Sequence, residues 1–499
     1  MSFLPEINSD VTINDLTRLN DVIRKNAGTQ VGYQTPAVMD GSFSPIVPQS
    51  IESTLASATF TMKDLALFKM LPKVQVSNTV HEYAVIKEHG LDFDPFISEG
   101  GGSSAEFGAT STSYERKSVK IKYMAERRQI SDVATLVGVI GPNANALAEE
   151  TERGTMSLLR KVESECFYGD EDVKAKGFDG LIKQIERTDG ARNFTTSGGR
   201  PFSQNQEDMA GASLSAVKLH DVLGELHSAP RFGKPDAIFV DPKQYSKLIA
   251  DSVQNGRHDA MLLVNQGDQG VLTLGAGPVL HVMGPMGPVP VIAAPFLNKQ
   301  MAAPTVGAGD AALRPSLPVF SAQPSQTAAA SQFDADGTGA GHDGQVRYVV
   351  VAVNAHGYSA PAISNAVIVN SDNGATFQLA VPAIAADYYR IYRTPCFEAG
   401  GAAALSNAQV LAQAKLIAEV LPSEVRAAAL VDNGFERLDC GRVLVASMDQ
   451  GVCEFARLLD FLRRPLSSTG AAQQFMLMLF GSPICKVPSK NFVLRNVAR

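Results

Sequence analysis

The chain has 499 residues, of which 45% are hydrophobic and 19% are charged, and its formal net charge is −7. This globular composition allows for two to four hydrophobic cores at roughly 150 residues per domain, and the negative charge gives no general electrostatic attraction to nucleic acid. No apolar run approaches the ~20 residues of a membrane span, and the first residues lack the basic and apolar regions of a secretory signal.

Residues 1–78 are predicted to form an arm rather than a domain. Short helices are predicted at Thr12–Asn26, near Ile51–Phe60 and near Lys63–Leu71, where Pro72 ends the last one. A segment rich in Gly and Pro follows the first of these helices. Short helices joined by such extended chain cannot bury much surface on their own.

Residues 79–131 are predicted to form a long hairpin with no core of its own. In its second arm apolar and polar side chains alternate, which is the period of a half-buried strand. The apolar positions are Val119, Ile121 and Tyr123, and the polar ones are Ser118, Lys120 and Lys122. The polar tip between the arms includes Glu99, Gly100, Gly101 and Gly102. Because an isolated two-stranded ribbon is marginally stable in water, we expect the apolar face to lie on a neighbouring copy of the chain.

The densest basic run of the chain lies on the second arm of this hairpin. Its members are Lys117, Lys120, Lys122, Arg127 and Arg128. Few aromatic side chains are placed to stack on bases, so a nucleic-acid site is disfavoured. We expect these cations to pair with acids of a neighbouring subunit, where complementary charges set the register of the contact more than its strength.

A long helix is predicted from Asn143, its N-cap, to Tyr168, with Gly169 as a left-handed stop. One apolar stripe runs along it and contains Leu147, Gly154, Leu158, Val162 and Cys166. At ~1.5 Å per residue this helix would be roughly 35–40 Å long. Such a length with so narrow a stripe indicates a spine on which other elements lie.

Alternating helices and strands are predicted from Ser213 onward. A helix ends near Ser228, a buried strand spans Ala237–Val240, and a second helix follows Asp241 and Pro242. Two short strands are predicted at Val279–Val282 and Val289–Ala293. This pattern is typical of an α/β unit of moderate size.

The last third of the chain is predicted to contain a linker, a β-rich unit and a mixed end. Residues 301–344 have the Ala, Gly, Ser and Pro content of a linker. Strands with polar turns then run from Gln345 to about Val431, which indicates a small β-sandwich. We expect a helix at Cys453–Arg464 and strands at Phe475–Phe480 and Phe492–Leu494.

Patterns that resemble catalytic or metal sites are incomplete. Asp334–Thr338 resembles the start of a calcium loop but lacks the further oxygen ligands and the closing Glu. Gly307–Ala312 opens no helix, as a dinucleotide-binding loop would. The eight histidines include no His-Glu-x-x-His pair. We therefore predict no catalytic residue, no cofactor and no metal.

The five cysteines lie far apart in the sequence, at Cys166, Cys396, Cys440, Cys453 and Cys485. None belongs to a Cys-x-x-Cys pair, so neither a zinc site nor a disulfide framework is indicated. Free thiols in a reducing compartment are the simplest interpretation.

The order of arm, hairpin, long helix and α/β unit resembles that of the major capsid proteins of tailed bacteriophages, with the Hong Kong 97-like fold that encapsulin shells share. The residues that carry this resemblance are Val162–Asp170, Gly177–Ile182, Leu462–Ser467 and the last strand through Ile484, Val487 and Val493. The β-rich unit is similar to fibronectin type III and related immunoglobulin-like modules. Its matching segments are Tyr348–Asn354, Gly357–Pro361 and Tyr389–Arg393.

The resemblance implies an α+β fold with five parts. These are an N-terminal arm (1–78), an extended loop (79–131), a peripheral domain with the spine helix (132–212 and 437–499), an apical domain (213–303) and a linker with an inserted all-β immunoglobulin-like domain (304–436).

The resemblance also implies a structural protein and not an enzyme. Many copies would form the hexamers and pentamers of an icosahedral shell around double-stranded DNA, without sequence-specific contacts to the DNA and without a membrane partner. A portal would occupy one vertex, and scaffold, cement or decoration proteins are further candidate partners. The shell would assemble in the host bacterial cytoplasm and become the virion capsid.

Two alternatives remain open from the sequence. One is an encapsulin-like protein container. The other is a capsid protein whose inserted domain also acts as a host-surface or glycan adhesion module. Some members of the resembling family crosslink a loop lysine to an asparagine of a neighbour, but the hairpin tip has no lysine, so no crosslink is expected.

Overall fold

The computed structural model describes most of the chain from Met62 onward. The described ranges are 62–89, 112–136, 146–186, 205–229, 231–254, 280–328, 331–333, 344–380, 383–398, 400–427, 430–467 and 470–499. Several expected features lie outside them, namely the helices at Thr12–Asn26 and Ile51–Phe60, the tip Glu99, Gly100, Gly101 and Gly102, the cap Asn143 and the acidic run Asp334–Thr338.

The described chain begins with two short helices and a strand. The 3-10 helix η1 (Met62–Asp64) and helix α2 (Leu67–Met70) lie where the sequence predicts a helical segment. Strand β1 (Lys73–Gln75) then pairs in parallel with the C-terminal strand β22 (Cys453–Leu466).

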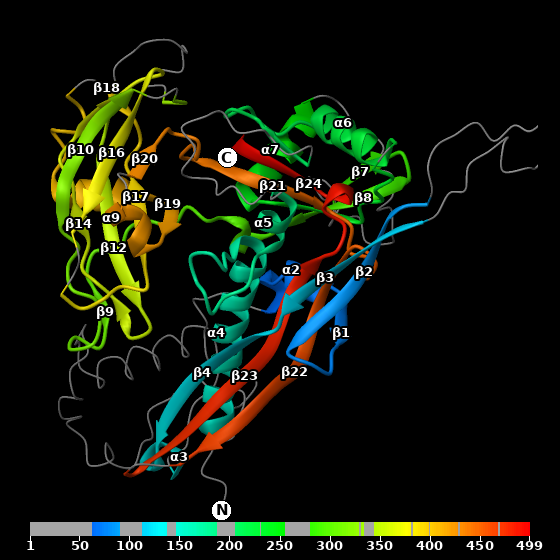
Figure 1. Cartoon of the computed structure of the whole chain (residues 1–499), viewed down its shortest axis with the longest axis horizontal. Coiled ribbons are helices and arrows are strands. Elements are labelled where there is room, and N and C mark those ends of the chain that lie inside the picture. The colour runs from blue at the N-terminus through cyan, green and yellow to red at the C-terminus, as the bar shows by residue number, and fades with distance from the viewer. Residues whose placement is uncertain are drawn as a thin grey trace, which may run out of the picture.

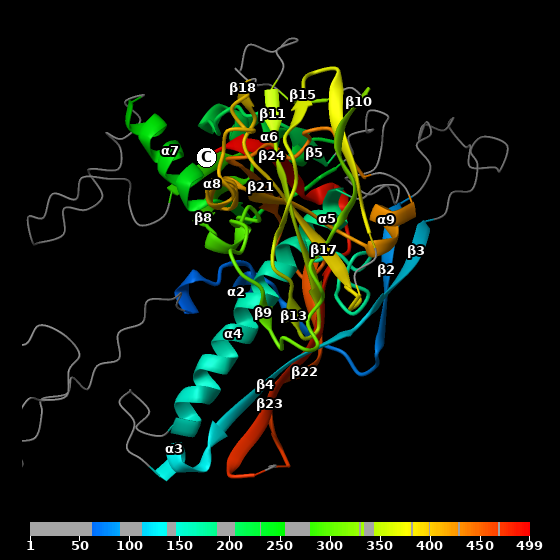
Figure 2. The ribbon, with the colours of Figure 1, turned by 90° about the vertical axis from the view of Figure 1, so that its left-hand side faces the viewer.

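The predicted hairpin is present, but it is broken at Ile121. Strands β2 (Val80–Glu88) and β3 (Ser113–Lys120) pair antiparallel in a sheet of their own. Strand β4 (Lys122–Ser131) belongs instead to the four-stranded sheet β1-β22-β23-β4 and leads into the short helix α3 (Asp132–Leu136). Figures 1 and 2 show the β2–β3 pair and the four-stranded sheet extending in opposite directions.

Strand β22 corrects the prediction of a helix at Cys453–Arg464. It pairs antiparallel with β23 (Ala472–Cys485) from Cys453 opposite Cys485 to Leu466 opposite Gln474. The register shifts between Arg457 and Leu459 and again between Leu459 and Leu462. Each shift changes which residues face the core, so the apolar positions lose the period of two and take on a helix-like spacing.

The spine helix α4 (Ala146–Tyr168) lies along β4 and β23, and α5 (Leu181–Glu186) packs beside its C-terminal end (Figure 1). The predicted stripe faces this core: Gly154, Leu158, Val162 and Cys166 are buried, and Leu147 packs against the same cluster. An added Cβ at Gly154 would lie 2.6 Å from Leu477 Cδ1, so a glycine lets the helix approach β23 closely.

Gly169 ends the helix for a different reason from the one predicted, because its backbone is not left-handed. It lies back to back with Gly180, whose N–H donates to the Gly169 carbonyl at 2.9 Å. A Cβ on Gly169 would lie 2.4 Å from the Phe178 carbonyl oxygen, and a Cβ on Gly180 would lie 2.6 Å from the Phe167 carbonyl oxygen. The two segments therefore require glycine at both positions to come this close.

A six-stranded sheet with the order β5-β24-β21-β6-β8-β7 forms the α/β unit. Its strands are β5 (Gln206–Asp208), β24 (Phe492–Ala498), β21 (Cys440–Ala446), β6 (Ala237–Val240), β8 (Gly287–Ala293) and β7 (Leu280–Gly284). The accompanying helices are α6 (Ala216–His227), α7 (Pro242–Gln254), η2 (Pro295–Leu297) and η3 (Pro488–Lys490). The sheet thus joins strands from residues 206–293 to strands from the C-terminal residues 440–498.

Both faces of this sheet are covered. Phe239 and Leu444 belong to the core that contains α4 and α5, whereas Ile238 and Val445 belong to a second core with α6 and α7. Strand β6 is accordingly buried at every position. A strand buried on both faces has a continuous apolar sequence, which is the signal that predicted it.

The β-rich unit consists of sheets that share one core containing Tyr348, Phe377 and Tyr389. One sheet has the order β10-β16-β20, with β10 (Phe320–Ala328), β16 (Asn373–Leu379) and β20 (Leu430–Asp432). A second has the order β19-β17-β12-β13-β9, with β19 (Lys415–Val420), β17 (Tyr388–Arg393), β12 (Tyr348–Asn354), β13 (Gly357–Tyr358) and β9 (Ala308–Gly309), and β14 (Ala362–Ile363) pairs with β12. The remaining elements are β15 (Val367–Val369), β11 (Gly344–Val346), β18 (Phe397–Glu398), α8 (Asn407–Gln413) and α9 (Pro422–Ala427).

Part of the predicted linker 301–344 is therefore structured. Strand β10 pairs with β16 at the edge of its sheet. Pro324 is its only fully buried residue, so the strand has no apolar face for sequence reasoning to detect. An exposed edge strand with small polar residues has the composition of a linker, which explains the wrong prediction.

We predict that Gly180→Ala lowers the free energy of unfolding by about 1–3 kcal/mol, because the added methyl group meets backbone atoms that cannot move independently. Gly224→Ala is the matched control, because no atom lies within 4 Å of a Cβ added at this position inside α6. Removing this helical glycine should stabilise the protein by about 0.5–1 kcal/mol. Urea titrations of the full chain measure both, and equal midpoints for the two variants would contradict the close approach.

Candidate assembly surfaces

The inner face of the hairpin packs on its own subunit, which corrects the expectation that a neighbour covers it. Ile121 is buried against Val76, Ala456 and Ile484, and Val119 packs at the border of the same cluster. The intrachain sheet of β22 and β23 supplies most of this surface.

Tyr123 lies on a different face from Val119 and Ile121, because the strand breaks at Ile121. In β3 the odd-numbered residues are the less exposed ones, whereas in β4 the even-numbered ones are. Tyr123 is consequently 57% exposed, and its ring meets Phe480 edge-on with 4.9 Å between the centroids.

The outer end of the hairpin carries the apolar surface that remains uncovered. Ile86 and Tyr114 are directly opposite each other on β2 and β3, and they are 50% and 69% exposed. Val80, at the base of β2, is also exposed. Ile86 and Tyr114 lie in the predicted arms but carry no signal of their own in the sequence, because their partnership depends on the register.

The basic run pairs mainly within the chain, which corrects a second expectation. Lys122 Nζ contacts Glu171 Oε1 at 2.7 Å, and Arg128 contacts Glu150 at 3.0 Å and also Glu126. Lys117 lies 3.5 Å from Glu115 of its own strand, and Arg127 donates to Gln474 Oε1 at 2.6 Å. Lys120 is exposed, and its role in assembly stays a prediction.

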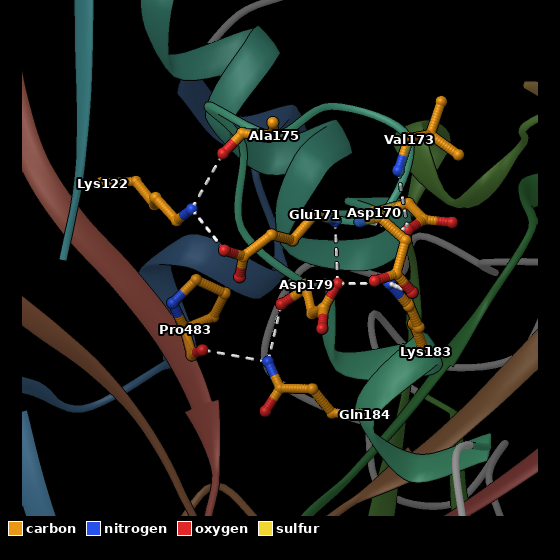
Figure 3. Close-up of polar contacts among 10 residues, drawn as sticks. Lys122, Asp170, Glu171, Val173, Ala175, Asp179, Lys183, Gln184 and Pro483 are labelled. Atoms are coloured by element: carbon orange, nitrogen blue, oxygen red, sulfur yellow. Dashed lines mark hydrogen bonds and ion pairs between the residues drawn. The ribbon is translucent and has the colours of Figure 1, made fainter. Parts of the chain in front are cut away.

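A polar cluster fixes the loop that follows the spine helix (Figure 3). The ammonium group of Lys183 donates to Asp179 at 2.5 Å and to Asp172 at 3.0 Å, and it also contacts Asp170. Burial alone would lower the Lys183 pKa, but the hydrogen bonds to Asp170 and Asp179 outweigh it, so the pKa is raised. Lys183 therefore stays charged and is shared by three carboxylates.

Gln184 joins this loop to the C-terminal end of β23 (Figure 3). Its Nε2 donates to the carbonyl oxygens of Asp179 at 2.6 Å and Pro483 at 3.0 Å. Its Oε1 accepts from the Cys485 N–H at 2.8 Å. One side chain thus satisfies backbone groups on both segments.

The buried carboxylate of Glu163 fixes the end of the N-terminal segment on the spine helix. It accepts hydrogen bonds from the backbone N–H groups of Ala66, Leu67 and Phe68 at 3.0, 2.8 and 2.7 Å. Burial raises the Glu163 pKa in spite of these hydrogen bonds. The three donors begin helix α2, so the carboxylate acts as its cap from a distant part of the chain.

A buried ion cluster lies where the chain returns from the β-rich unit to the sheet. Glu436 contacts Arg442 and lies 2.9 Å from Arg495, and Glu186 of α5 lies 3.5 Å from Arg442. Burial would raise the Glu436 pKa, but Arg442 and Arg495 hold it far below its usual value. The Glu436 carbonyl also accepts from Arg393 of β17 at 2.6 Å.

The β-rich unit contacts the loop after the spine helix through one lysine. Lys174 Nζ lies 3.0 Å from Glu419 of β19 and 2.7 Å from Glu165 of α4. Glu419 also contacts Arg390 at 3.0 Å. Burial would raise the Glu419 pKa, but Lys174 and Arg390 outweigh it and lower the pKa to about 2.

Neither a metal site nor a membrane span is found in the part of the chain that the structure describes. No group of three or more His, Cys, Asp or Glu side chains there could hold a metal ion. No helix among the same residues is long and apolar enough to cross a membrane.

Comparisons with known proteins give one family model and several distant relatives. The family model described as SU10 major capsid protein matches residues 52–311, which is more than half of the chain. The major capsid proteins of Staphylococcus phage K and Staphylococcus phage S25-3 are each 25% identical over 144 residues, which cover 28% of this chain. The aligned part spans only 30% of the length of those two relatives.

Solved structures give weaker similarity over most of the chain. The capsid of a native GTA particle is 11% identical, with a TM-score of 0.41, over 94% of this chain and 100% of that one. The SrpI encapsulin of Synechococcus elongatus is 9% identical, with a TM-score of 0.39, over 89% of this chain and 93% of that one. A chain from Mycobacterium phage Adephagia is 8% identical, with a TM-score of 0.39, over 93% of this chain and 98% of that one.

We predict that Glu419→Gln lowers the free energy of unfolding by about 2–3 kcal/mol at pH 7. The folded pKa of Glu419 is about 2 against an ordinary 4.5, so its stabilisation is complete above pH 4.5 and is lost as the pH falls toward 2. The difference from the unchanged protein should therefore shrink across this window in thermal unfolding scans. Glu398→Gln, on the exposed end of β18, is the control; a constant difference for Glu419→Gln from pH 7 to pH 3 would refute the assignment.

Proposed function

Because this chain belongs to the SU10 major capsid protein family, we propose that it is the major capsid protein of a tailed phage, whose copies form the hexamers and pentamers of an icosahedral shell. The family is one of structural capsid proteins and not of enzymes. The shell would enclose double-stranded DNA without sequence-specific contacts, which fits a net charge of −7.

One observation carries this proposal: the β2–β3 hairpin leaves apolar side chains exposed that no described part of its own subunit covers. Its inner face is covered by β22 and β23, but Ile86 and Tyr114 are exposed side by side near its outer end. Exposed apolar neighbours on a two-stranded ribbon favour burial against another chain. In a shell of identical copies, the adjacent subunit is the available partner.

We propose that the parts of the chain take the roles of a Hong Kong 97-like capsid subunit. Residues 1–78 would be the arm, 79–131 the extended loop, 132–212 and 437–499 the peripheral domain, and 213–303 the apical domain. Strands β21 and β24 of residues 437–499 extend the sheet of that apical part. Residues 304–436 would contain an inserted immunoglobulin-like domain on the outer surface. The packing of strands β10 to β20 around a shared core supports an all-β domain in this part of the chain.

The remaining partners follow from the same proposal. A portal would replace one pentamer, and a scaffold or cement protein would assist closure of the shell. Assembly would take place in the host cytoplasm. An encapsulin-like container would instead hold an enzyme, so the contents of purified particles, nuclease-protected DNA or protein cargo, distinguish the two.

We predict that the double variant Ile86→Ser and Tyr114→Ser folds normally but forms few closed shells, because it loses the apolar contact between subunits. Circular dichroism should match that of the unchanged chain, and negative-stain electron microscopy should show open or missing particles. Ile368→Ser is the control, since Ile368 is 43% exposed on β15 of the β-rich unit. Normal shells from the double variant would refute the proposed role of the hairpin.

A second prediction concerns the hairpin tip. Deleting residues 100–104 should preserve the secondary structure of the subunit and impair shell closure, because the tip would no longer reach the neighbour. Electron micrographs and heat treatment of the particles measure closure and shell stability. Heat-stable particles of normal shape from this deletion would contradict the proposed reach of the loop.

A further inference from the structure

Two cysteines lie directly opposite each other where the long β22–β23 ribbon begins. Cys453 is the first residue of β22 and Cys485 the last residue of β23, and they are cross-strand partners. Both side chains are buried in the same core and both are free thiols. Beyond this pair the chain turns into β21 on one side and β24 on the other.

The backbone hydrogen bonds show which kind of cross-strand pair this is. The Lys486 N–H donates to the Val452 carbonyl at 2.8 Å, one position beyond the two cysteines. The Cys453 N–H donates to the Asp449 carbonyl and the Cys485 N–H to Gln184 Oε1, both at 2.8 Å. Neither cysteine amide points at its partner, so Cys453 and Cys485 form a non-hydrogen-bonded pair.

Non-hydrogen-bonded pairs bring side chains closest together. Their Cα atoms lie about 4.5 Å apart, which falls within the roughly 4.4–6.8 Å range of disulfides. The register therefore places the two cysteines at a backbone separation that a disulfide can span.

We propose that Cys453 and Cys485 are an oxidation site that closes to a cross-strand disulfide when the protein leaves a reducing compartment. In the reduced state the pair fills the core as two small apolar groups. A capsid protein that leaves the host cell with its virion meets an oxidising medium, in which disulfides persist. The timing therefore rests on the proposed capsid function, whereas the reaction itself depends only on the geometry of the pair.

The reaction balances with a small disulfide as oxidant. The Cys485 thiolate attacks this disulfide, breaking its S–S bond, forming a mixed disulfide and releasing one thiolate. The Cys453 thiolate then attacks the Cys485 sulfur, forming the intrachain bond and releasing the second thiolate. The two cysteines lose two electrons and two protons, and the oxidant becomes two thiols.

Two features decide which cysteine reacts first and how fast. The Cys453 pKa is raised well above its usual value by its hydrogen bond with Cys485 and by burial. Cys485, whose Sγ accepts a hydrogen bond from Asn491 Nδ2 at 3.3 Å, therefore attacks first in the proposed reaction. Because both sulfurs are buried, the oxidant reaches them only after local opening of the end of the β22–β23 ribbon where the two cysteines lie.

The disulfide would lock the junction between the ribbon and the six-stranded sheet. It would close a loop that contains nearly all of β22 and β23, so the unfolded chain would lose conformational freedom. Strands β22 and β23 could then no longer separate from each other beginning at the end where Cys453 and Cys485 lie. In a shell under internal pressure, the β22–β23 ribbon would then keep a fixed position relative to the six-stranded sheet.

Mass spectrometry of the full chain tests the proposal. The protein is incubated with hydroxyethyl disulfide, its remaining thiols are alkylated under denaturing conditions, and its peptides are mapped. We expect one linked peptide pair joining Cys453 to Cys485 with the loss of two hydrogens, and alkylation at Cys166, Cys396 and Cys440. Alkylation of all five cysteines, mixed disulfides only, or links to other cysteines would overturn the proposal.

Thermal unfolding supplies the second measurement and the control variants. The oxidised chain should unfold a few degrees higher than the reduced chain, and dithiothreitol should reverse the shift. Cys485→Ala should abolish this response, whereas Cys166→Ala, which removes an equally buried cysteine outside the pair, should keep it. Shell formation in micrographs is scored separately, so failure of the crosslink and failure of assembly are distinguished.

Discussion

The fixed C-terminal end of the spine helix α4 is the constraint on which the rest of the subunit depends. Within two turns and one loop, it binds the N-terminal segment through Glu163, the α/β unit through the Tyr168 hydroxyl, and the β-rich unit through Lys174. Glu171 in the same loop holds Lys122 at the start of β4. Each of these contacts joins residues far apart in sequence, so the helix end sets the relative position of every part.

Most of these contacts use charged groups, and this choice affects specificity more than stability. Moving a carboxylate such as Glu163 or Glu436 out of water costs several kcal/mol, and its hydrogen bonds and ion pairs largely offset that cost. A misplaced element would leave the same carboxylate buried without partners, which is far more unfavourable. Apolar packing alone would tolerate small displacements of one part against another, whereas a carboxylate with three fixed donors does not.

The sequence predicted the elements whose signal is local and missed those whose signal comes from pairing. Helices α4 and α6 and strand β6 carry an uninterrupted apolar pattern, and this local pattern alone predicts them. Strand β22 carries two register shifts, and edge strand β10 has almost no buried residue, so neither shows a strand pattern. Contacts between distant residues, such as Lys174 with Glu419, leave no spacing signal at all.

The distribution of charge inside the subunit also bears on how copies of it would attract one another. Lys122 and Arg128 are already paired with acids of their own chain, so they contribute little net attraction to a neighbour. The outer end of the β2–β3 hairpin instead offers Ile86 and Tyr114, whose burial gains free energy in proportion to apolar area. Apolar contacts are not screened by ions, whereas exposed ion pairs weaken over a Debye length of about 8 Å at physiological salt. Hairpin contacts in the proposed shell would therefore persist at salt concentrations that abolish surface ion pairing, and charge would mainly select the register in which the apolar surfaces meet.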